Sequence, residues 1–170
     1  MRRTAARALI PVAALFLASA CQSDVAELRA DPGEKHAFHI AAPYATVRAN
    51  IEKTVVHCYE AEYDGPPVQA LVSRLRVKTT ETTPGSAANV TYWQEGMTTR
   101  PLFSVDVAAA KDGTDVTFYQ RGSYAIFTDY APIVRGWAMG TGKCGGPTPR
   151  KPAQPPEITP LPANTAITPL

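Results

Sequence analysis

The distribution of proline limits what this chain can fold into more than any other feature of the sequence. Eight of the 16 prolines lie between Pro147 and Pro169, where apolar residues are isolated from one another. A segment of that composition buries too little apolar surface to fold and favours the extended polyproline II conformation. We therefore predict a disordered, proline-rich tail over residues 146–170 and a compact domain before it.

The first 20 residues have the composition of a secretory signal. Arg2, Arg3 and Arg7 precede a short apolar stretch at residues 8–17, and small residues follow it. The stretch is too short to span a bilayer, and the sequence contains no run of 18 apolar residues. A buried N-terminal helix is the alternative, but it would not explain the flanking arginines and small residues. We expect residues 1–20 to direct export and to be removed.

The residues at the end of this segment resemble the lipobox of bacterial lipoproteins, in which cleavage leaves an N-terminal cysteine that carries acyl chains. Residues 18–21 read Ala-Ser-Ala-Cys; the match departs at Ala18, where leucine is commoner, and ordinary signal peptidase would also accept the sequence. The resemblance implies a lipid on Cys21 and stable membrane attachment by several acyl chains. Because residue 22 is glutamine and not aspartate, the resemblance also implies that the protein is attached to the outer membrane and faces the periplasm. Residues 21–34 would then be the lipidated N-terminus and a tether.

The chain has three cysteines, Cys21, Cys58 and Cys144. If lipid occupies Cys21, an even number remains in an oxidising compartment, which favours a disulfide. We predict a bridge between Cys58 and Cys144, and two separate buried thiols are the alternative. A catalytic thiol is not favoured, because the sequence has no Cys-x-x-Cys motif and only His57 stands next to a cysteine.

The net charge argues against a nucleic-acid partner. Without residues 1–20, which contain three arginines and no acid, the chain has 14 basic and 15 acidic residues. Phosphate binding needs clustered positive charge. The small basic stripe of Arg74, Arg76 and Lys78 is typical of the solvated face of a strand.

Hydrophobic periodicity predicts the elements of a domain at residues 35–145. Residues 43–60 are the clearest helix, because Val47 and Ile51 belong to an apolar stripe at helical spacing while Asn50 falls on the polar side. Alternating patterns predict strands at residues 35–41, 71–78, 89–94, 102–109 and 114–121, and a second helix starts at Asp129. The order β-α-β-β-β-β-α predicts an α+β fold, an antiparallel sheet of four to five strands with two helices on one face.

This order of elements resembles the helix-grip architecture, which includes the repeated domains of an outer-membrane assembly lipoprotein. Together with the lipobox and the two remaining cysteines, it also resembles small, uncharacterised proteobacterial lipoproteins. The resemblance covers about residues 35–145. It implies a fold rather than an activity, because one fold serves many functions.

Tyr92, Trp93 and Tyr119 are the candidate binding surface, because exposed aromatic side chains on a sheet face suit recognition. Core packing is the alternative for these residues. We expect no catalytic residue, no metal site and no cofactor. His36 and His39 would point to opposite faces of a strand, and no acidic set completes a zinc site. The sequence also lacks the Gly-x-Ser-x-Gly elbow of many serine hydrolases.

These observations favour a non-enzymatic lipoprotein of the bacterial cell envelope, attached to the membrane through its N-terminal lipid. It would serve as an interaction or structural module and contact an envelope protein or a cell-wall component. The alternative is a carrier that holds a lipid or another small apolar ligand between helix and sheet. A carrier predicts an internal apolar cavity, whereas an interaction module predicts a filled core and an exposed apolar patch.

Overall fold

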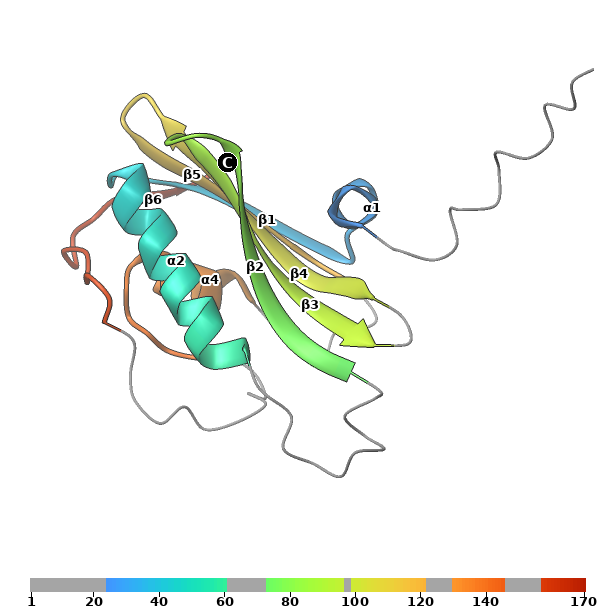
Figure 1. Cartoon of the computed structure of the whole chain (residues 1–170). Coiled ribbons are helices and arrows are strands. Elements are labelled where there is room, and N and C mark those ends of the chain that lie inside the picture. The colour runs from blue at the N-terminus through green and yellow to red at the C-terminus, as the bar shows by residue number, and fades with distance from the viewer. Residues whose placement is uncertain (1–23, 61–72, 97–98, 122–129, 146–156) are drawn as a thin grey trace, which may run out of the picture.

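The computed structural model describes residues 24–60, 73–96, 99–121, 130–145 and 157–170. The expected signal, the lipid attachment site at Cys21, the expected helix start at Asp129 and the first part of the expected tail lie outside these ranges. The described residues form a single sheet with helices on both of its faces (Figure 1).

Six antiparallel strands form one open sheet in the order β2-β3-β4-β5-β1-β6. The strands are β1 (Glu34–Ile40), β2 (Ser73–Thr83), β3 (Ala87–Gly96), β4 (Arg100–Ala110), β5 (Gly113–Gln120) and β6 (Ile167–Pro169). The α+β class and the antiparallel sheet agree with the sequence prediction. The sheet has one strand more than the upper end of the predicted range, and the end of the chain supplies it as β6.

The strands form where apolar and polar residues alternate. In β4, Val105 and Val107 point into the core, while Asp106 between them points to the opposite face and is half-buried. The pairing between β3 and β4 shifts between Tyr92 and Trp93, where Phe103 pairs with Tyr92 but Pro101 pairs with Trp93. Such a shift changes the local twist and redirects the side chains beside it.

The predicted helix over residues 43–60 is present as α2 (Tyr44–Tyr59). Its apolar stripe packs on the sheet, and Val47 and Ile51 are fully buried. Asn50, which the sequence places on the polar side, is also buried, at 1% exposure, and so is Thr54, at 0%. The buried arc is wider than predicted because α2 contacts α4 as well as the sheet.

The second helix is α4 (Tyr130–Ala138), and it ends well before Cys144. Gly140 stops it with a positive φ of 73°, a conformation that costs glycine little. The amide of Gly140 donates to the carbonyl oxygen of Trp137, and the amide of Thr141 donates to that of Gly136. These two bonds form the Schellman motif that satisfies the last carbonyl groups of a helix.

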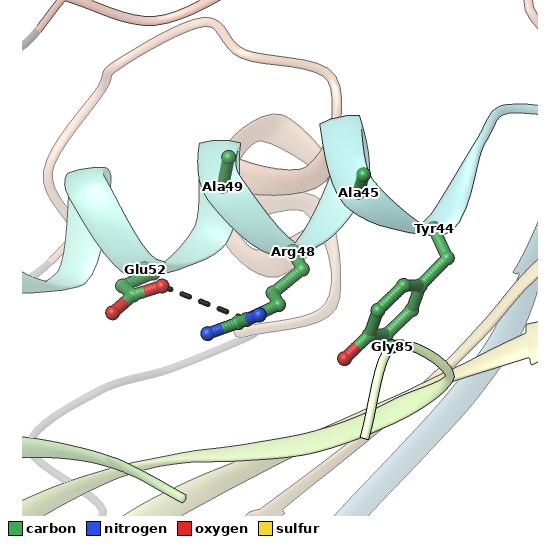
Figure 2. Close-up of a pocket in the computed structure, with 6 residues that line it drawn as sticks. All are labelled: Tyr44, Ala45, Arg48, Ala49, Glu52 and Gly85. Atoms are coloured by element: carbon green, nitrogen blue, oxygen red, sulfur yellow. Dashed lines mark ion pairs between the residues drawn. The ribbon is translucent and has the colours of Figure 1, made fainter. Parts of the chain in front are cut away.

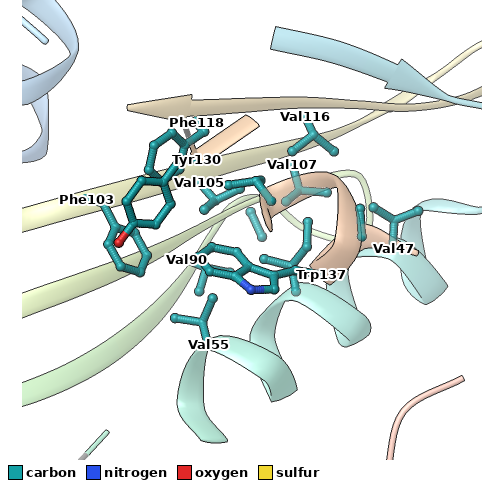
Figure 3. Packing of buried hydrophobic residues seen from close by; sticks show 14 of the residues in the cluster. Val47, Val55, Val90, Phe103, Val105, Val107, Val116, Phe118, Tyr130 and Trp137 are labelled. Atoms are coloured by element: carbon teal, nitrogen blue, oxygen red, sulfur yellow. The ribbon is translucent and has the colours of Figure 1, made fainter. Parts of the chain in front are cut away.

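Aromatic side chains fill the space between the helices and the sheet (Figure 3). The ring of Phe103 lies at the centre of this cluster. Its centroid is 5.1 to 6.3 Å from the ring centroids of Tyr59, Tyr92, Phe118, Tyr130 and Trp137. Trp137 of α4 is fully buried. Rings at these separations pack at interior density and make a large contribution to the hydrophobic stabilisation of the domain.

The predicted disulfide is present. Cys58, near the end of α2, is bonded to Cys144, which follows α4, and the two Cα atoms are 5.4 Å apart. That separation lies within the usual range for a disulfide. The bridge therefore attaches the segment after α4 to α2. It lies on the helical side of the sheet.

A short helix, α1 (Val25–Ala30), lies within the segment that the sequence predicted to be a tether. Asp24 caps it, and Oδ1 of this residue accepts a hydrogen bond of 2.8 Å from the amide of Glu27. α1 contacts β4 and β5 on the face of the sheet opposite α2 (Figure 1). The domain thus begins earlier than residue 35.

The prediction of a disordered tail must be corrected for residues 157–170. This segment packs along α2 and α4, and it ends in β6, which pairs with β1. The prediction for residues 146–156 lies outside the described residues. The composition of the tail limits how much apolar surface it can bury, but main-chain hydrogen bonds hold most of the described part in place.

Candidate functional site

The candidate binding surface lies on the face of the sheet opposite α2 and α4, which we call the outer face. Trp93 and Tyr119 are half-buried there. Tyr92 does not belong to this surface: it is 7% exposed and packs in the core against Tyr59 and Phe103. The structure therefore brings two of the three predicted aromatic residues to the outer face and places the third inside.

Lysine side chains lie over both aromatic rings of the outer face. Lys78 Nζ is 5.4 Å from the ring centroid of Trp93, and Lys35 Nζ is 5.8 Å from that of Tyr119. Cation–π contacts at exposed positions contribute about 0.5–1 kcal/mol each. Lys78 Nζ also pairs with Glu95 at 2.7 Å. The result is a surface of aromatic rings covered by lysine side chains, which suits contact with a polar partner.

A buried polar cluster from β3 and β4 lies beneath this surface. Asn89, Thr91 and Ser104 are 6%, 1% and 0% exposed. Asn89 Nδ2 donates to Ser104 Oγ at 2.5 Å and to Asp106 Oδ1 at 2.7 Å, and Thr91 Oγ1 donates to Asn89 Oδ1. Buried polar groups are stable when they have such partners. Within the described residues, Ser104 bonds to Asn89 and Thr91, and neither side chain is a base that would activate a nucleophile.

α1 docks on this cluster through an ion pair. Arg29 Nε and Nη2 donate to the two carboxylate oxygens of Asp106 at 2.9 and 2.6 Å, a two-point geometry that is specific to arginine. The hydrogen bond to Asp106 raises the pKa of Arg29. Leu28, one residue earlier, is 1% exposed. One apolar and one charged contact thus hold the helix to the sheet.

The histidines do not form a metal site. His39 Nδ1 lies 2.8 Å from Asp115 Oδ1, and its Nε2 lies 3.5 Å from Asp112 Oδ1. The ring of His36 points to the other face and stacks with Phe118 at a centroid distance of 6.4 Å. Over the part of the chain that the structure describes, no three side chains of His, Cys, Asp or Glu are grouped to hold a metal ion.

Two open hollows lie at the N-terminal end of α2. The first, about 370 Å³, is lined by Tyr44, Ala45, Arg48, Ala49, Glu52 and Gly85 (Figure 2). The second, about 400 Å³, is lined by Ala41, Ala42, Pro43, Tyr44, Ala109, Ala110, Asp112 and Gly113. Arg48 pairs with Glu52 at 3.7 Å and with Glu81 at 2.5 Å. Its charge is therefore already neutralised, and small side chains provide most of the remaining lining.

Tyr59 and Tyr130 are titratable groups inside the aromatic cluster. Burial raises the pKa of Tyr59 to about 12, and its hydroxyl donates to the carbonyl oxygen of Gly145 at 2.6 Å. Burial also raises the pKa of Tyr130, and the neighbouring Tyr59 raises it further. Both side chains are buried in the aromatic cluster, and burial is the main cause of both shifts.

No family model, curated protein or solved structure matches the chain. None of the helices within the described ranges has the length and apolar character needed to span a bilayer.

Reasoning from the sequence missed two groups of residues that organise these surfaces. The first is α1 with its Arg29–Asp106 pair, although Asp24 followed three residues later by Glu27 is a recognisable N-terminal capping pattern. The second is Asn50, whose burial depends on contacts with residues more than 80 positions away. No local signal could have revealed those contacts.

Proposed function

We propose that this protein is a lipoprotein of the bacterial cell envelope, anchored through Cys21 to the outer membrane and facing the periplasm. In this proposal it acts as a non-enzymatic interaction module that contacts an envelope protein or a cell-wall component. The observation that carries the proposal is the Cys58–Cys144 bridge. Structural disulfides belong to oxidising compartments, and this one uses two of the three cysteines and leaves Cys21 for a lipid.

The arrangement of elements supports a helix-grip-like description at a finer level than the α+β class. One long helix and one short helix cover the same face of an antiparallel sheet. Strands β2 to β5 are neighbours in chain order, and β1 pairs with the last of them, β5. In this description α1 and β6 are additions, one on the outer face and one at the β1 edge.

The packing of the interior favours an interaction module over an apolar carrier. Aromatic rings fill the space where a carrier would hold its ligand, and the two hollows described above open to solvent at the end of α2. The expected apolar patch is small, because Val56 and Leu170 are the large hydrophobic side chains exposed among the described residues. Recognition would therefore rest on the outer face and on main-chain groups at the edges of the sheet.

Fractionation of cells tests the anchor directly. We expect the unaltered chain in the outer-membrane fraction, carrying an acyl label, and the Cys21→Ser variant in the soluble periplasmic fraction. Gln22→Asp is the matched control, because it keeps the cysteine but alters the sorting residue; the variant should stay membrane-bound and move to the inner membrane. Unchanged fractionation of Cys21→Ser, or a cytosolic chain that starts at Met1 with three reduced thiols, would refute the proposal.

A further inference from the structure

The last 14 residues contain the same tetrapeptide twice. Residues 158–161 and residues 167–170 both read Ile-Thr-Pro-Leu. The two copies lie against the domain at two different places, and the second forms strand β6. In both copies the isoleucine is half-buried while the threonine and the proline are exposed.

The first copy is held by the side chain of a buried asparagine. Asn50 Nδ2 donates to the carbonyl oxygen of Thr159 at 2.8 Å, and the amide of Thr159 donates to Asn50 Oδ1 at 3.1 Å. The side chain of Asn50 thus makes the same pair of hydrogen bonds with the main chain of residue 159 that a neighbouring strand would make. Asn50 Nδ2 also lies 3.2 Å from the carbonyl oxygen of Ala138, which fixes the amide at the end of α4.

The end of α4 is shaped to admit the same segment. The amide of Leu161 donates to the carbonyl oxygen of Met139 at 2.9 Å. A Cβ atom on Gly140 would lie 2.8 Å from the carbonyl oxygen of Thr159 and 3.1 Å from Cα of Pro160. Only glycine therefore allows the segment to approach this closely.

The second copy adds a strand to the sheet. β6 pairs with β1 so that Ile167 lies opposite Ile40, and the amide of Leu170 donates to the carbonyl oxygen of Ala37 at 3.1 Å. The leucine amide of each copy thus donates to a main-chain carbonyl of the domain. Addition of an extended segment to a sheet edge is a common mode of peptide recognition.

We call the surface formed by Asn50, Met139, Gly140 and the edge of β1 the tail groove. Its hydrogen bonds go to main-chain atoms of the segment, and its apolar contacts are made by Leu161 and Ile167. Each seat therefore holds a proline-containing segment through main-chain bonds and one aliphatic side chain, Leu161 at the first seat and Ile167 at the second. Proline suits an extended segment because it fixes φ and needs no hydrogen-bond acceptor.

We propose that the tail groove is a peptide-binding site for extended segments of the Ile-Thr-Pro-Leu type carried by a partner protein. Residues 157–170 occupy it as an internal ligand that such a partner displaces. The repeat supports this assignment, because the domain binds the same tetrapeptide at two seats and in both of them the main-chain amide of the leucine donates to a carbonyl oxygen of the domain. The inference deepens the proposed function, in that it names the class of partner that the interaction module recognises.

The test uses a variant of the full chain whose own tail cannot fill the first seat. Thr159→Pro with Leu161→Pro removes both amide donors of the first copy and leaves every residue of the groove unchanged. A fluorescent peptide of residues 157–163 is then titrated, with binding followed by anisotropy. We expect saturable binding to this variant, binding to the unaltered chain that is weaker by about tenfold or more, and no binding of a peptide that carries the Thr159→Pro change.

Two glycine variants in the tail-displaced background show whether the peptide occupies the groove. Gly140→Ala places a Cβ against the seat and should weaken binding by about tenfold or more. Gly85→Ala is the matched control, because Gly85 has a similar positive φ of 69° and a Cβ there would meet nothing within 4 Å. It should leave the affinity unchanged.

The proposal is overturned if the folded, disulfide-bonded variant binds the peptide more weakly than about 1 mM, or if the two glycine variants behave alike. Should the double variant fail to fold, Thr159→Pro alone serves, because it still removes the amide that donates to Asn50 Oδ1. The measurement needs neither Cys21 nor a membrane. Its failure is therefore separate from a failure of the lipid anchor in the fractionation experiment.

Discussion

Reduction of the Cys58–Cys144 bridge should remove a large share of the stability of the domain. The two cysteines are 86 positions apart, so the bridge closes a loop of 87 residues when both ends are counted. The chain-entropy relation gives about 4.6 kcal/mol for a loop of that length. Domains of this size are stable by only about 5–15 kcal/mol, so the reduced protein should be marginal at physiological temperature.

Urea unfolding of three samples separates the effect of the crosslink from the effect of packing. The oxidised and reduced forms of the unaltered chain differ in the crosslink alone, and we expect a difference of about 4–5 kcal/mol in the free energy of unfolding. The Cys58→Ala, Cys144→Ala double variant also removes both sulfur atoms. Since Cys58 is 2% exposed, we expect a further loss of about 1–2 kcal/mol from the cavity.

Fluorescence of Trp137, which lies on α4 and is fully buried, reports the transition. The slope of the unfolding curve should also rise on reduction, because the unfolded chain becomes less compact and exposes more surface. A difference below about 1 kcal/mol between the oxidised and reduced forms would refute the reasoning. It would mean that the bridge does not restrict the unfolded chain as the loop length requires.

Two further predictions concern the core and α1. Because burial raises the pKa of Tyr59 to about 12, the stability that its protonated form provides is complete below the unfolded pKa of about 10. That stability, about 2–3 kcal/mol, is lost as the pH rises to 12. Tyr59→Phe should flatten this alkaline decline in urea unfolding, and an unchanged decline would contradict the assignment. Arg29→Ala should lower global stability by less than about 1 kcal/mol, because the pair with Asp106 is partly exposed. The same change should speed hydrogen exchange at Leu28, whereas Arg29→Lys should have a smaller effect; equal exchange in all three chains would show that the pair does not hold α1.

The sequence predicts the elements whose burial follows a local period. Val47 and Ile51 mark the buried side of α2, and the alternation of Val105, Asp106 and Val107 marks β4. The Cys58–Cys144 bridge could also be predicted, because the argument from cysteine number, which starts from the expectation of export, does not depend on the details of packing.

The sequence does not predict elements whose stability depends on distant main-chain partners. In the sequence, Asn50 is indistinguishable from the exposed polar residues of the helix. Its burial becomes apparent only when residue 159 is placed beside it. β6 is three residues long and has no pattern of its own; it exists because the edge of β1 accepts it.

The candidate surface was only partly predictable for a related reason. Tyr92 and Trp93 are neighbours, so an extended strand sends them to opposite faces, but the sequence does not say which one enters the core. The pairing of Tyr92 with Phe103 settles the choice, and that pairing is a property of the whole sheet.

α1 and the tail groove lie on opposite faces of the sheet, and this gives the molecule a direction. Only three peptide units separate Cys21 from Asp24, and they span at most about 10 Å. A copy anchored through Cys21, as proposed, would therefore keep the α1 side of the domain close to the bilayer, and a partner of the outer face would have to approach along the membrane surface. In that orientation the tail groove would face away from the bilayer, because the sheet and part of the helical layer, about 10 Å thick, would lie between them. The docking of the six-residue helix α1 would thus determine which side of an anchored copy faces the periplasm.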